Sequence, residues 1–498
     1  MRVTSSLHPA RLAAAAILLA GPTAIAFFSG GYFDEARLWA CLVALLLVVA
    51  VAAVAHPPLP RSRAPRVALA GLALLALLAG LSAFWAPSRG PALDDSQRLL
   101  LYAATLVAGT AVMRPRLLAR AVEPALALGV LVVIGYGLSG RLLPGIVHMT
   151  HGFASQGRLD QPLTYWNAEG ALAAMGLTLG ARLAGDGSRP LGVRTAAAAA
   201  VAPLASALYL SFSRGGLAGI AAGVVLLALL SPNRAQARAL GLCVTVGGLA
   251  MAATALLPEV REIVGHTHSR ELQGVGLLAI LIALIVAAAI VQAWACGAER
   301  DGRLSSGPLS LTRRTVAVAV IAVLVAGGVA FGLASGEKGP QARGATARRL
   351  GSIQSSRYSY WRVAFKTFAH HPIAGSGSGS FRFEWLRERD IAEPVRDAHS
   401  LYFETAGELG LLGLIALGMF LGGVAASALA VRARDPLLSP GLTALVGVWA
   451  LMCALDWHWE MPAVTLPALV AASTLLARAD SYAGAPVAAV AVERTAAG

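Results

Sequence analysis

One histidine stands where a side chain could transfer a proton. His399 lies in the run DAHSLY (397–402), where a long polar segment gives way to an apolar one. Imidazole takes up and releases protons near neutral pH, because its unperturbed pKa is about 6.5. Tyr402, Glu404 and Glu408 follow in the expected helix, and carboxylates near a bilayer boundary tend to have a partner, here expected to be an arginine. His399 is the candidate general base; the alternative is a histidine that only caps the helix.

Two arginines occupy positions suited to binding phosphate. Arg214 lies in SFSRGG (211–216), a short turn between apolar runs where Ser213 is one of the few other polar groups. Arg357 lies one helical turn before Trp361 in a segment rich in aromatic residues. A guanidinium presents a planar fork of donors at every accessible pH, which fits a phosphate group. The alternatives are a cation that extends to the bilayer edge and, for Arg357, a plain interfacial anchor.

Other polar residues beside apolar runs are weaker candidates. Arg158 and Asn167 bound the segment RLDQPLTYWN, which leads into an apolar run and would place both residues near the same surface. His266 and His268 form an isolated pair without a third ligand at suitable spacing, so the sequence predicts no metal site. The run WHW (457–459) is typical of an aromatic belt at a helical hairpin.

A long polar segment, residues 336–400, carries several of these side chains. From 357 to 368 its aromatic residues recur at steps of three and four, which predicts an amphipathic helix lying in the headgroup layer. The run GSGSGS (375–380) predicts a flexible turn, and only weakly an anion cradle. Phe381, Phe383 and Trp385 would seat a second interfacial helix after that turn.

The composition requires lipid as the solvent of most of the chain. Hydrophobic residues make up 57% of it and charged residues 13%, more apolar surface than a soluble domain can bury. About 20 apolar residues are needed to cross roughly 30 Å of hydrocarbon. The sequence therefore predicts an all-α, polytopic integral membrane protein with about 12–14 transmembrane helices and one long extracytoplasmic loop. The expected spans lie near 12–28, 38–55, 67–85, 99–113, 121–139, 167–183, 195–211, 215–230, 239–257, 274–295, 315–335, 402–430, 438–456 and 462–477.

Arginines in the connections set the expected orientation. With the N-terminus in the cytoplasm, the basic clusters at 61–66, 114–120, 189–194 and 432–434 fall inside, as the positive-inside rule requires. Both termini are then cytoplasmic and residues 336–400 lie outside. The net charge of +14 follows from this topology, and no basic-aromatic motif indicates a nucleic-acid partner. The bilayer is the expected partner, and the sequence carries no signal for the oligomeric state.

Several motifs occur together in the order of a known family. The chain resembles the O-antigen ligase and polymerase superfamily in TYWNAEGALAA (164–174), SFSRGGLAGI (211–220), RYSYWRVAFKTFAHHPIAGSGSGSF (357–381) and AHSLYFETAGELGLLGL (398–414). The resemblance is strongest over residues 200–425. The expected regions are N-terminal transmembrane helices at 1–199, a ligase-like domain at 200–425 with the periplasmic loop 336–400, a C-terminal hairpin at 426–480 and a disordered cytoplasmic tail at 481–498.

The resemblance implies a bacterial membrane glycosyltransferase of the GT-C type that needs no metal ion or cofactor. Its donor would be a glycan on a polyprenyl diphosphate, usually undecaprenyl diphosphate, at the outer face of the cytoplasmic membrane. By motif, Arg214 and Arg357 would hold the diphosphate and His399 would activate the acceptor hydroxyl. Ser400 stands where family members often have asparagine. The acceptor would be the core oligosaccharide of lipopolysaccharide, another lipid-linked repeat or a protein hydroxyl.

Two other classes of protein remain open at this point. A flippase or transporter of a lipid-linked oligosaccharide would explain the spans and the lipid diphosphate equally well. Against it, no internal repeat is evident and few ionisable residues lie at mid-membrane. A structural partner of an envelope assembly machine would use the long loop as a docking surface. Ligases, polymerases and protein glycosyltransferases of the superfamily share the same motifs, so the sugar and the acceptor stay undetermined.

Overall fold

The computed structural model describes residues 8–54, 59–263, 266–309 and 356–483. These residues form helices joined by turns and loops, and no β-strand occurs among them. The expected span at 315–335, the loop residues 336–355 and the tail from 484 onward lie outside the described residues. The protein is an all-helical, polytopic membrane protein, as the sequence predicts, and its chain divides into two compact units.

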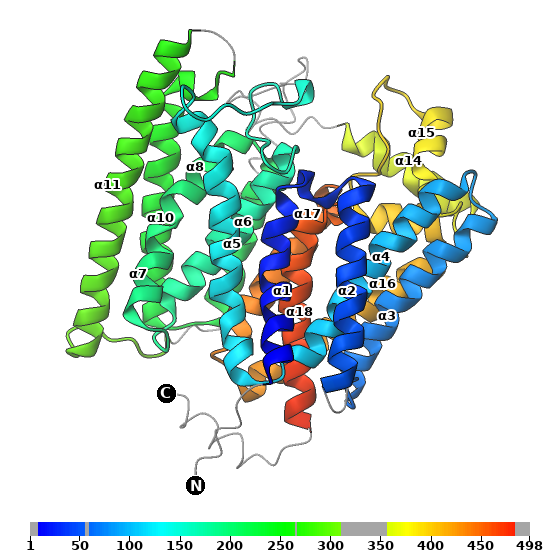
Figure 1. The fold of residues 1–498 in the computed structure, drawn as a ribbon, viewed down its shortest axis with the longest axis horizontal. Coiled ribbons are helices and arrows are strands. Elements are labelled where there is room, and N and C mark those ends of the chain that lie inside the picture. Colours follow the sequence, from blue (N-terminus) through cyan, green and yellow to red (C-terminus); the bar gives the residue numbers. More distant parts are fainter. Residues whose placement is uncertain (1–7, 55–58, 264–265, 310–355, 484–498) are drawn as a thin grey trace. The chain divides into compact units, whose positions relative to one another are not determined.

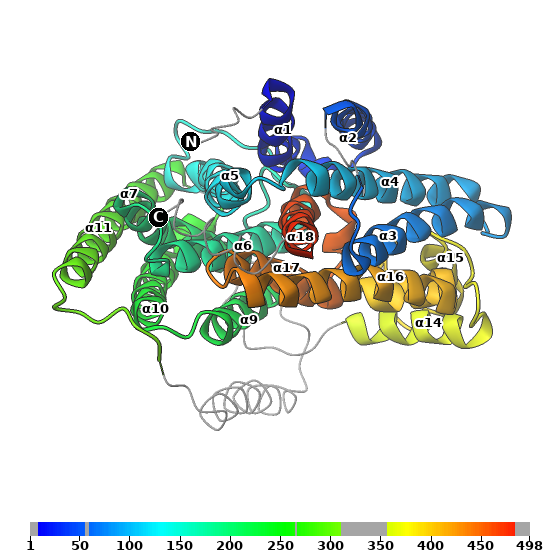
Figure 2. The same ribbon diagram turned by 90° about the horizontal axis from the view of Figure 1, so that it is seen from below.

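The first unit comprises Met1–Leu126, Ser356–Val446 and Cys453–Gly498. Its helices are α1 (Pro9–Ala26), α2 (Asp34–Val54), α3 (Arg63–Leu81), α4 (Arg89–Val112), α14 (Arg357–His370), α15 (Phe381–Glu388), α16 (Leu401–Arg434) and α18 (Pro462–Ala483). Helices α3 and α16 run side by side (Figure 2). A Cβ on Gly71 would lie 2.4 Å from the backbone nitrogen of Phe420. Glycine therefore lets the two backbones approach, as is common between membrane helices.

The second unit comprises Ala127–Ser355 and Gly447–Met452. Its helices are α6 (Trp166–Gly185), α7 (Leu191–Ala199), α8 (Val201–Ser211), α9 (Arg214–Leu230), α10 (Arg234–Ala255) and α11 (Thr267–Arg300), while α5 (Arg116–Leu142) and α17 (Ser439–Leu455) have residues in both units. Figure 1 shows α6 among its neighbours α8 and α10. Every residue of α6 after Trp166 is buried, so this helix forms the core of the unit.

The helices coincide with the expected spans. Every predicted span except that at 315–335 falls on a helix. Among the described residues, nine helical segments are long and apolar enough to cross a membrane, and α9 and α17 are shorter apolar helices. Helices α4 and α6, with 24 and 20 residues, are also long enough to cross a membrane but are not among these nine segments. The expected span at 195–211 is divided into α7 and α8 by a break at Ala200.

The helix ends that the sequence places in the cytoplasm gather at one end of the first unit. Asp480 accepts hydrogen bonds from the backbone nitrogens of Arg61 (2.7 Å) and Ser62 (2.8 Å). Arg116 pairs with Asp435 at 3.1 Å. These contacts join connections that lie far apart in the sequence, as the predicted topology requires.

The second unit contains a similar group. Glu299, near the end of α11, pairs with Arg194 at 2.8 Å and with Arg238 at 2.5 Å. The three side chains come from connections that the basic residues assign to the cytoplasmic side. Each unit thus has one end where these connections meet, and the sidedness itself stays a prediction.

Candidate active site

Two short helices cover the start of α16. Helices α14 and α15 pack against α16 near its first turns (Figures 1 and 2). Their common core consists of Tyr360, Val363, Ala364, Phe381, Trp385 and Ala398. The predicted contact of Phe381 and Trp385 with the membrane interface is therefore wrong, because both side chains are buried within the protein. This core holds the segment 389–400, which leads from α15 into α16, and so determines where His399 lies.

His399 occupies a specific backbone conformation. Its φ is +55°, in the left-handed region that side-chain-bearing residues adopt infrequently. Glu404 holds this turn, because its carboxylate accepts a hydrogen bond from the backbone nitrogen of Ala398 at 2.7 Å. The expected arginine partner of Glu404 is replaced here by a backbone amide.

The hydrogen bond of the His399 ring determines its tautomer. The Nδ1 atom lies 3.0 Å from the backbone oxygen of Asp397. A carbonyl oxygen can only accept a hydrogen bond, so Nδ1 carries the proton in the neutral ring. The lone pair is then on Nε2, and this nitrogen can accept a proton. This hydrogen bond leaves Nε2 of His399 available to accept a proton.

Aromatic side chains surround His399. The Tyr360 ring lies 5.0 Å from the imidazole, and the Trp457 ring lies 6.5 Å from it in an edge-to-face arrangement. The indole nitrogen of Trp361 donates to the backbone oxygen of His399 at 3.5 Å, and its ring stacks on Phe403 at 5.4 Å. Trp361 thus supports the backbone of the histidine.

Arg357 forms an ion pair with Asp456. The Asp456 side chain is 2% exposed and that of Arg357 is 19% exposed. Burial alone would raise the pKa of Asp456, but the Arg357 guanidinium and the nearby histidines outweigh it and lower this pKa to about 2. Asp456 therefore stays ionised and positions Arg357. A guanidinium has five N–H donors, so the same side chain can contact a carboxylate and a phosphate.

The turn between α17 and α18, residues 456–460, belongs to this site. Its Glu460 binds both terminal nitrogens of Arg98, one of them at 2.7 Å, and Arg98 also pairs with Asp95 at 2.9 Å. His458 and Trp459 are buried, so the interpretation of this turn as an interfacial aromatic belt is wrong for these two residues. The sequence analysis did not include this turn in the site. The signal that could have revealed it is the pair of carboxylates, Asp456 and Glu460, between two apolar runs.

Glu408 binds the glycine-rich turn. Its carboxylate accepts hydrogen bonds from the backbone nitrogens of Gly379 (2.8 Å) and Phe381 (2.9 Å). Gly375 has a φ of +66°, and a Cβ there would lie 2.2 Å from the backbone of Glu408. The turn predicted between two helices is present. The anion that its amides bind is a carboxylate of the protein itself, which gives Glu408 a structural role.

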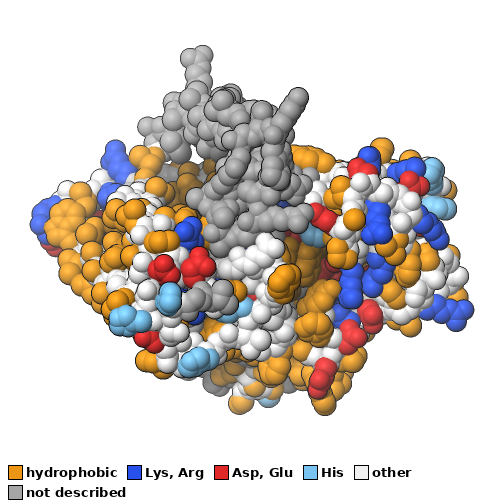
Figure 3. Space-filling model, turned by 90° about the horizontal axis from the view of Figure 1, so that it is seen from above, with side chains coloured by type: hydrophobic (Ala, Val, Ile, Leu, Met, Phe, Trp, Pro, Cys, Tyr) orange, Lys and Arg blue, Asp and Glu red, His pale blue; other side chains and the backbone are white. Residues whose placement is uncertain are grey.

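The outward stripe of α14 agrees with the predicted amphipathic pattern. Tyr358 and Phe365 are 52% and 59% exposed, whereas Tyr360, Val363 and Ala364 on the other side are buried. Figure 3 shows Lys and Arg side chains among hydrophobic ones over α14 and α15. Tyr402 is half-buried in the first turn of α16. Contact of this surface with lipid headgroups stays a prediction.

The second unit carries the remaining candidate residues. Ser213 caps α9 by accepting a hydrogen bond from the nitrogen of Gly216 at 3.1 Å, and it is buried. Arg214 follows at the first position of α9 and is partly exposed. A helix N-terminus favours anions because its backbone N–H groups and dipole point outward. Arg214 and the start of α9 together suit an anionic group.

Arg158 and Asn167 are engaged within their own loop. The guanidinium of Arg158 lies 3.5 Å from the centre of the Trp166 ring and donates to the backbone oxygen of Ser155 at 2.7 Å. Asn167 donates to the Tyr165 hydroxyl at 2.8 Å. Both side chains are buried, which gives them a structural role in this loop.

One group of carboxylates has the spacing of a metal site. Among the described residues, ligand oxygens of Asp397, Glu404 and Glu460 lie within 4.8 Å of one another. Burial raises the pKa of Asp397, and the charges of His399 and other nearby cations partly offset this effect. Arg98 already supplies a positive charge to Glu460. This group could hold a cation, and the predicted independence of metal stays a prediction.

A comparison with known families identifies part of the chain. Residues 267–418 match the family described as O-antigen ligase. The match includes Arg357 and His399, whereas Arg214 and the 456–460 turn fall outside it. No curated protein matches the chain. The resemblance to the O-antigen ligase and polymerase superfamily is confirmed for this segment, and the chain is a multi-pass membrane protein.

Proposed function

We propose that this protein is an inverting glycosyltransferase of the GT-C type. It transfers a glycan from a polyprenyl diphosphate to an acceptor hydroxyl at the outer face of the cytoplasmic membrane. The observation that carries the proposal is the orientation of His399, whose Nδ1 lies 3.0 Å from a backbone carbonyl oxygen and so leaves Nε2 to accept a proton in the neutral ring. The Arg357–Asp456 pair in the same unit supports it. The ligase-type family match is consistent with this reaction class.

The reaction has two requirements that these residues can meet. An acceptor hydroxyl is a poor nucleophile, so His399 takes its proton on Nε2 as the oxygen attacks C1 of the donor sugar. A positioned base typically accelerates such a step by about 10²–10⁴-fold. The bond from C1 to the diphosphate oxygen breaks on the opposite side of the sugar, which inverts the anomeric centre.

The leaving group is the lipid diphosphate, on which negative charge develops. Arg357, oriented by Asp456, and Arg214, at the start of α9, supply donors and positive charge to it. Such preoriented charges stabilise the transition state most strongly where water is excluded. In this proposal the two arginines take the place that a metal ion has in other diphosphate-cleaving enzymes. Addition of a chelator should then leave the rate of transfer unchanged.

The experiment is a transfer assay in proteoliposomes with a polyprenyl-diphosphate-linked repeat unit as the donor. Glycan length and released lipid diphosphate are measured with and without a separate acceptor. A ladder of lengthening chains from the donor alone identifies a polymerase. Release that requires an added glycolipid or peptide identifies a ligase or a protein glycosyltransferase. Movement of the intact donor across the bilayer without bond cleavage would instead identify a flippase and overturn the proposal.

A further inference from the structure

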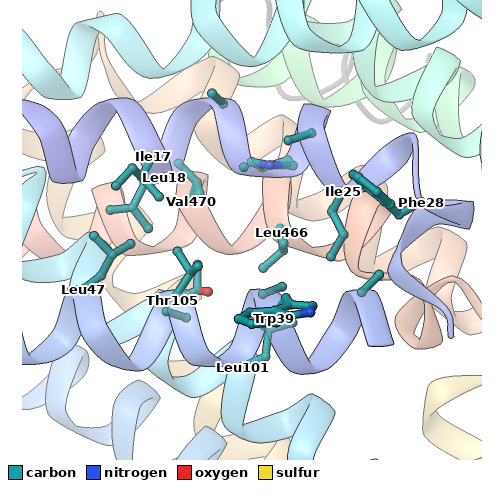
Figure 4. A pocket seen from close by; sticks show the side chains of 18 of the residues that line it. Ile17, Leu18, Ile25, Phe28, Trp39, Leu47, Leu101, Thr105, Leu466 and Val470 are labelled. Carbon is teal, nitrogen blue, oxygen red and sulfur yellow. The ribbon is translucent and has the colours of Figure 1, made fainter. Parts of the chain in front are cut away.

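The diphosphate of the proposed donor needs polar or charged partners, which the apolar groove of the first unit does not offer. This groove lies between α1, α2, α4 and α18, and Figure 4 shows side chains such as Leu18, Leu47, Leu101 and Val470 on its walls. An anion buried there without partners would be strongly unfavourable. The polar side chains of the second unit are better suited to a phosphate group.

A histidine and an aspartate form a dyad in the loop between α5 and α6. The Nδ1 atom of His151 lies 2.6 Å from Oδ1 of Asp160, and the other carboxylate oxygen accepts a hydrogen bond from the backbone nitrogen of Gly152 at 3.2 Å. The Asp160 side chain is fully buried, whereas that of His151 is 14% exposed. A buried carboxylate that binds Nδ1 fixes the tautomer and the orientation of an imidazole. Nε2 is therefore the nitrogen that can bind a ligand, and no described residue forms a hydrogen bond with it.

The dyad lies at the end of the second unit that carries Arg214. The backbone nitrogen of Leu159, next to the aspartate, donates to the backbone oxygen of Leu210 at 2.9 Å, and Leu210 precedes Arg214 by four residues. The start of α6 lies at the same end, because a Cβ on Gly170 would be 2.5 Å from the Cβ of Ser213. The loop, the start of α6 and the start of α9 are thus neighbours.

The other charged side chains around the dyad are bound to the protein itself. Arg141 of α5 donates to the backbone oxygens of Gly157 and Arg158, both at 3.0 Å. Arg158 stacks on a tryptophan ring, as described above. Glu169 of α6 is buried and accepts a hydrogen bond from the backbone nitrogen of Leu163 at 3.1 Å. These contacts hold the two arginines and the glutamate within the fold, whereas Nε2 of the histidine stays available to a ligand.

We propose that the protonated ring of His151 binds the diphosphate of the donor, together with Arg214 in the same unit. This inference rests on the proposed function, because that reaction supplies the diphosphate. In the imidazolium, Nδ1–H stays bound to Asp160, and Nε2–H donates a charge-assisted hydrogen bond to a phosphate oxygen. The neutral ring has no charge and a lone pair at Nε2, so binding should weaken as the pH rises and the ring loses its proton. In the alternative, the dyad only holds the loop together.

The test measures binding of undecaprenyl diphosphate to the purified full-length protein in nanodiscs of phosphatidylcholine. The dissociation constant is determined at about pH 6 and about pH 8.5, on either side of the range in which imidazole titrates. The variants are His151→Gln, which has no titrating ring, and His151→Arg, which carries a cation at both pH values. The diphosphate also changes its charge with pH, so the ratio of the variant and wild-type constants at each pH isolates the effect of position 151. His148→Gln, at an exposed position of the same loop, is the matched control.

We expect His151→Gln to weaken binding by about tenfold at the lower pH, because one charge-assisted hydrogen bond is lost. At the higher pH its affinity should match that of the wild-type protein, and His151→Arg should bind more tightly than both. His148→Gln should match the wild-type protein throughout. A ratio near one for His151→Gln at both pH values, in a variant that keeps the wild-type thermal midpoint, would leave the dyad with a purely structural role and overturn the inference. A ratio that is the same at both pH values but differs from one would overturn it as well, since the charge of the ring would then have no part in binding.

A lipid headgroup is another source of phosphate, and a competition experiment separates it from the donor. Phosphatidylglycerol replaces part of the phosphatidylcholine in the nanodiscs. We expect it to leave the ratio for His151→Gln unchanged, and displacement of undecaprenyl diphosphate from the wild-type protein alone would assign the dyad to headgroups and overturn the inference. Binding that depends on His151 in a protein without transfer activity would retain the diphosphate site and reject the proposed function. Transfer activity combined with a ratio near one would do the reverse.

Discussion

The proton acceptor of the proposed reaction depends on one hydrogen bond and one backbone conformation. His399→Asn tests both, because asparagine tolerates a positive φ better than most residues but cannot act as a base. We expect kcat to fall by about 10²–10⁴-fold. The thermal midpoint should stay close to that of the wild-type protein, since the Ala398–Glu404 hydrogen bond is retained. Transfer at the wild-type rate by this variant would exclude His399 as the base.

Arg357 has two roles that substitution can separate. Lysine keeps the charge opposite Asp456 but loses the planar fork of donors that the proposed function assigns to the diphosphate. Arg357→Lys should therefore retain most of the stability and raise the KM for the donor. Arg357→Ala removes the cation that pairs with the buried Asp456 carboxylate, and loss of one partner of a buried ion pair typically costs about 3–5 kcal/mol. Thermal midpoints and donor kinetics of the two variants measure the separation, and equal donor kinetics for Ala and wild-type proteins would reject the diphosphate role.

Arg362→Lys provides the matched control for this pair of variants. Arg362 belongs to the same helix and pairs with Asp390 at 3.0 Å, but both side chains are largely exposed. Exposed ion pairs contribute about 0–1 kcal/mol. Neither the donor KM nor the thermal midpoint should change in this control.

At the scale of elements, the α17–α18 turn links the site to the stability of the fold. His458 in this turn is buried, and neither ring nitrogen has a hydrogen-bond partner among the described residues. Burial lowers the pKa of His458 from 6.5 to about 4. Between these two values the unfolded chain binds a proton that the folded protein does not, so stability falls as the pH falls through this window.

The resulting decrease in the free energy of unfolding should reach about 2 kcal/mol at pH 5 relative to pH 7. His458→Phe removes the titrating group while keeping an aromatic ring in the turn. We expect the thermal midpoint of this variant to change less between pH 7 and 5 than that of the wild-type protein. His371→Gln, at an exposed position after α14, serves as the control and should keep the wild-type slope. If the thermal midpoint of His458→Phe fell between pH 7 and 5 as much as that of the wild-type protein, His458 would not be the group that causes the loss of stability.

At the scale of the whole molecule, the elements were more predictable than their contacts. Apolar runs locate membrane helices because a chain in lipid must satisfy its backbone hydrogen bonds internally, which a helix with apolar side chains does. The amphipathic stripe of α14 follows from the same periodicity. The partner of Arg357 could not be read in this way, because Asp456 lies 99 residues away in the sequence. Glu408 shows the same limit, since the amides that it binds lie 27 and 29 residues earlier.

The candidate site residues differ in the contacts that the fold gives them, and these contacts could not be predicted from residue type. His399 and Arg357 were proposed as site residues from residue type and position, because a titratable or cationic group at a membrane boundary is costly without a partner or a function. Arg158 met the same criterion, yet its guanidinium stacks on Trp166 and holds its own loop. Residue type alone therefore does not separate a ligand-binding arginine from a structural one. The local contacts of the folded chain make that distinction.

The topology of the whole chain can be tested with single cysteines. The natural residues Cys41, Cys296 and Cys453 are buried and Cys243 is half-buried, so the wild-type protein should label weakly with a membrane-impermeant maleimide. Arg387→Cys introduces an exposed thiol in α15, and Arg303→Cys introduces one after α11. The positive-inside pattern places these two positions on opposite sides of the membrane.

In intact cells or spheroplasts we expect Arg387→Cys to label and Arg303→Cys to label only after the membrane is permeabilised. Arg61→Cys, exposed before α3, should behave like Arg303→Cys and extends the test to the cytoplasmic end of the first unit. Labelling of Arg303→Cys without permeabilisation would show that Arg303 faces the outside, opposite to the orientation predicted for the second unit. Labelling of Arg387→Cys only after permeabilisation would place α14, α15 and His399 in the cytoplasm, where the proposed transfer at the outer face could not take place.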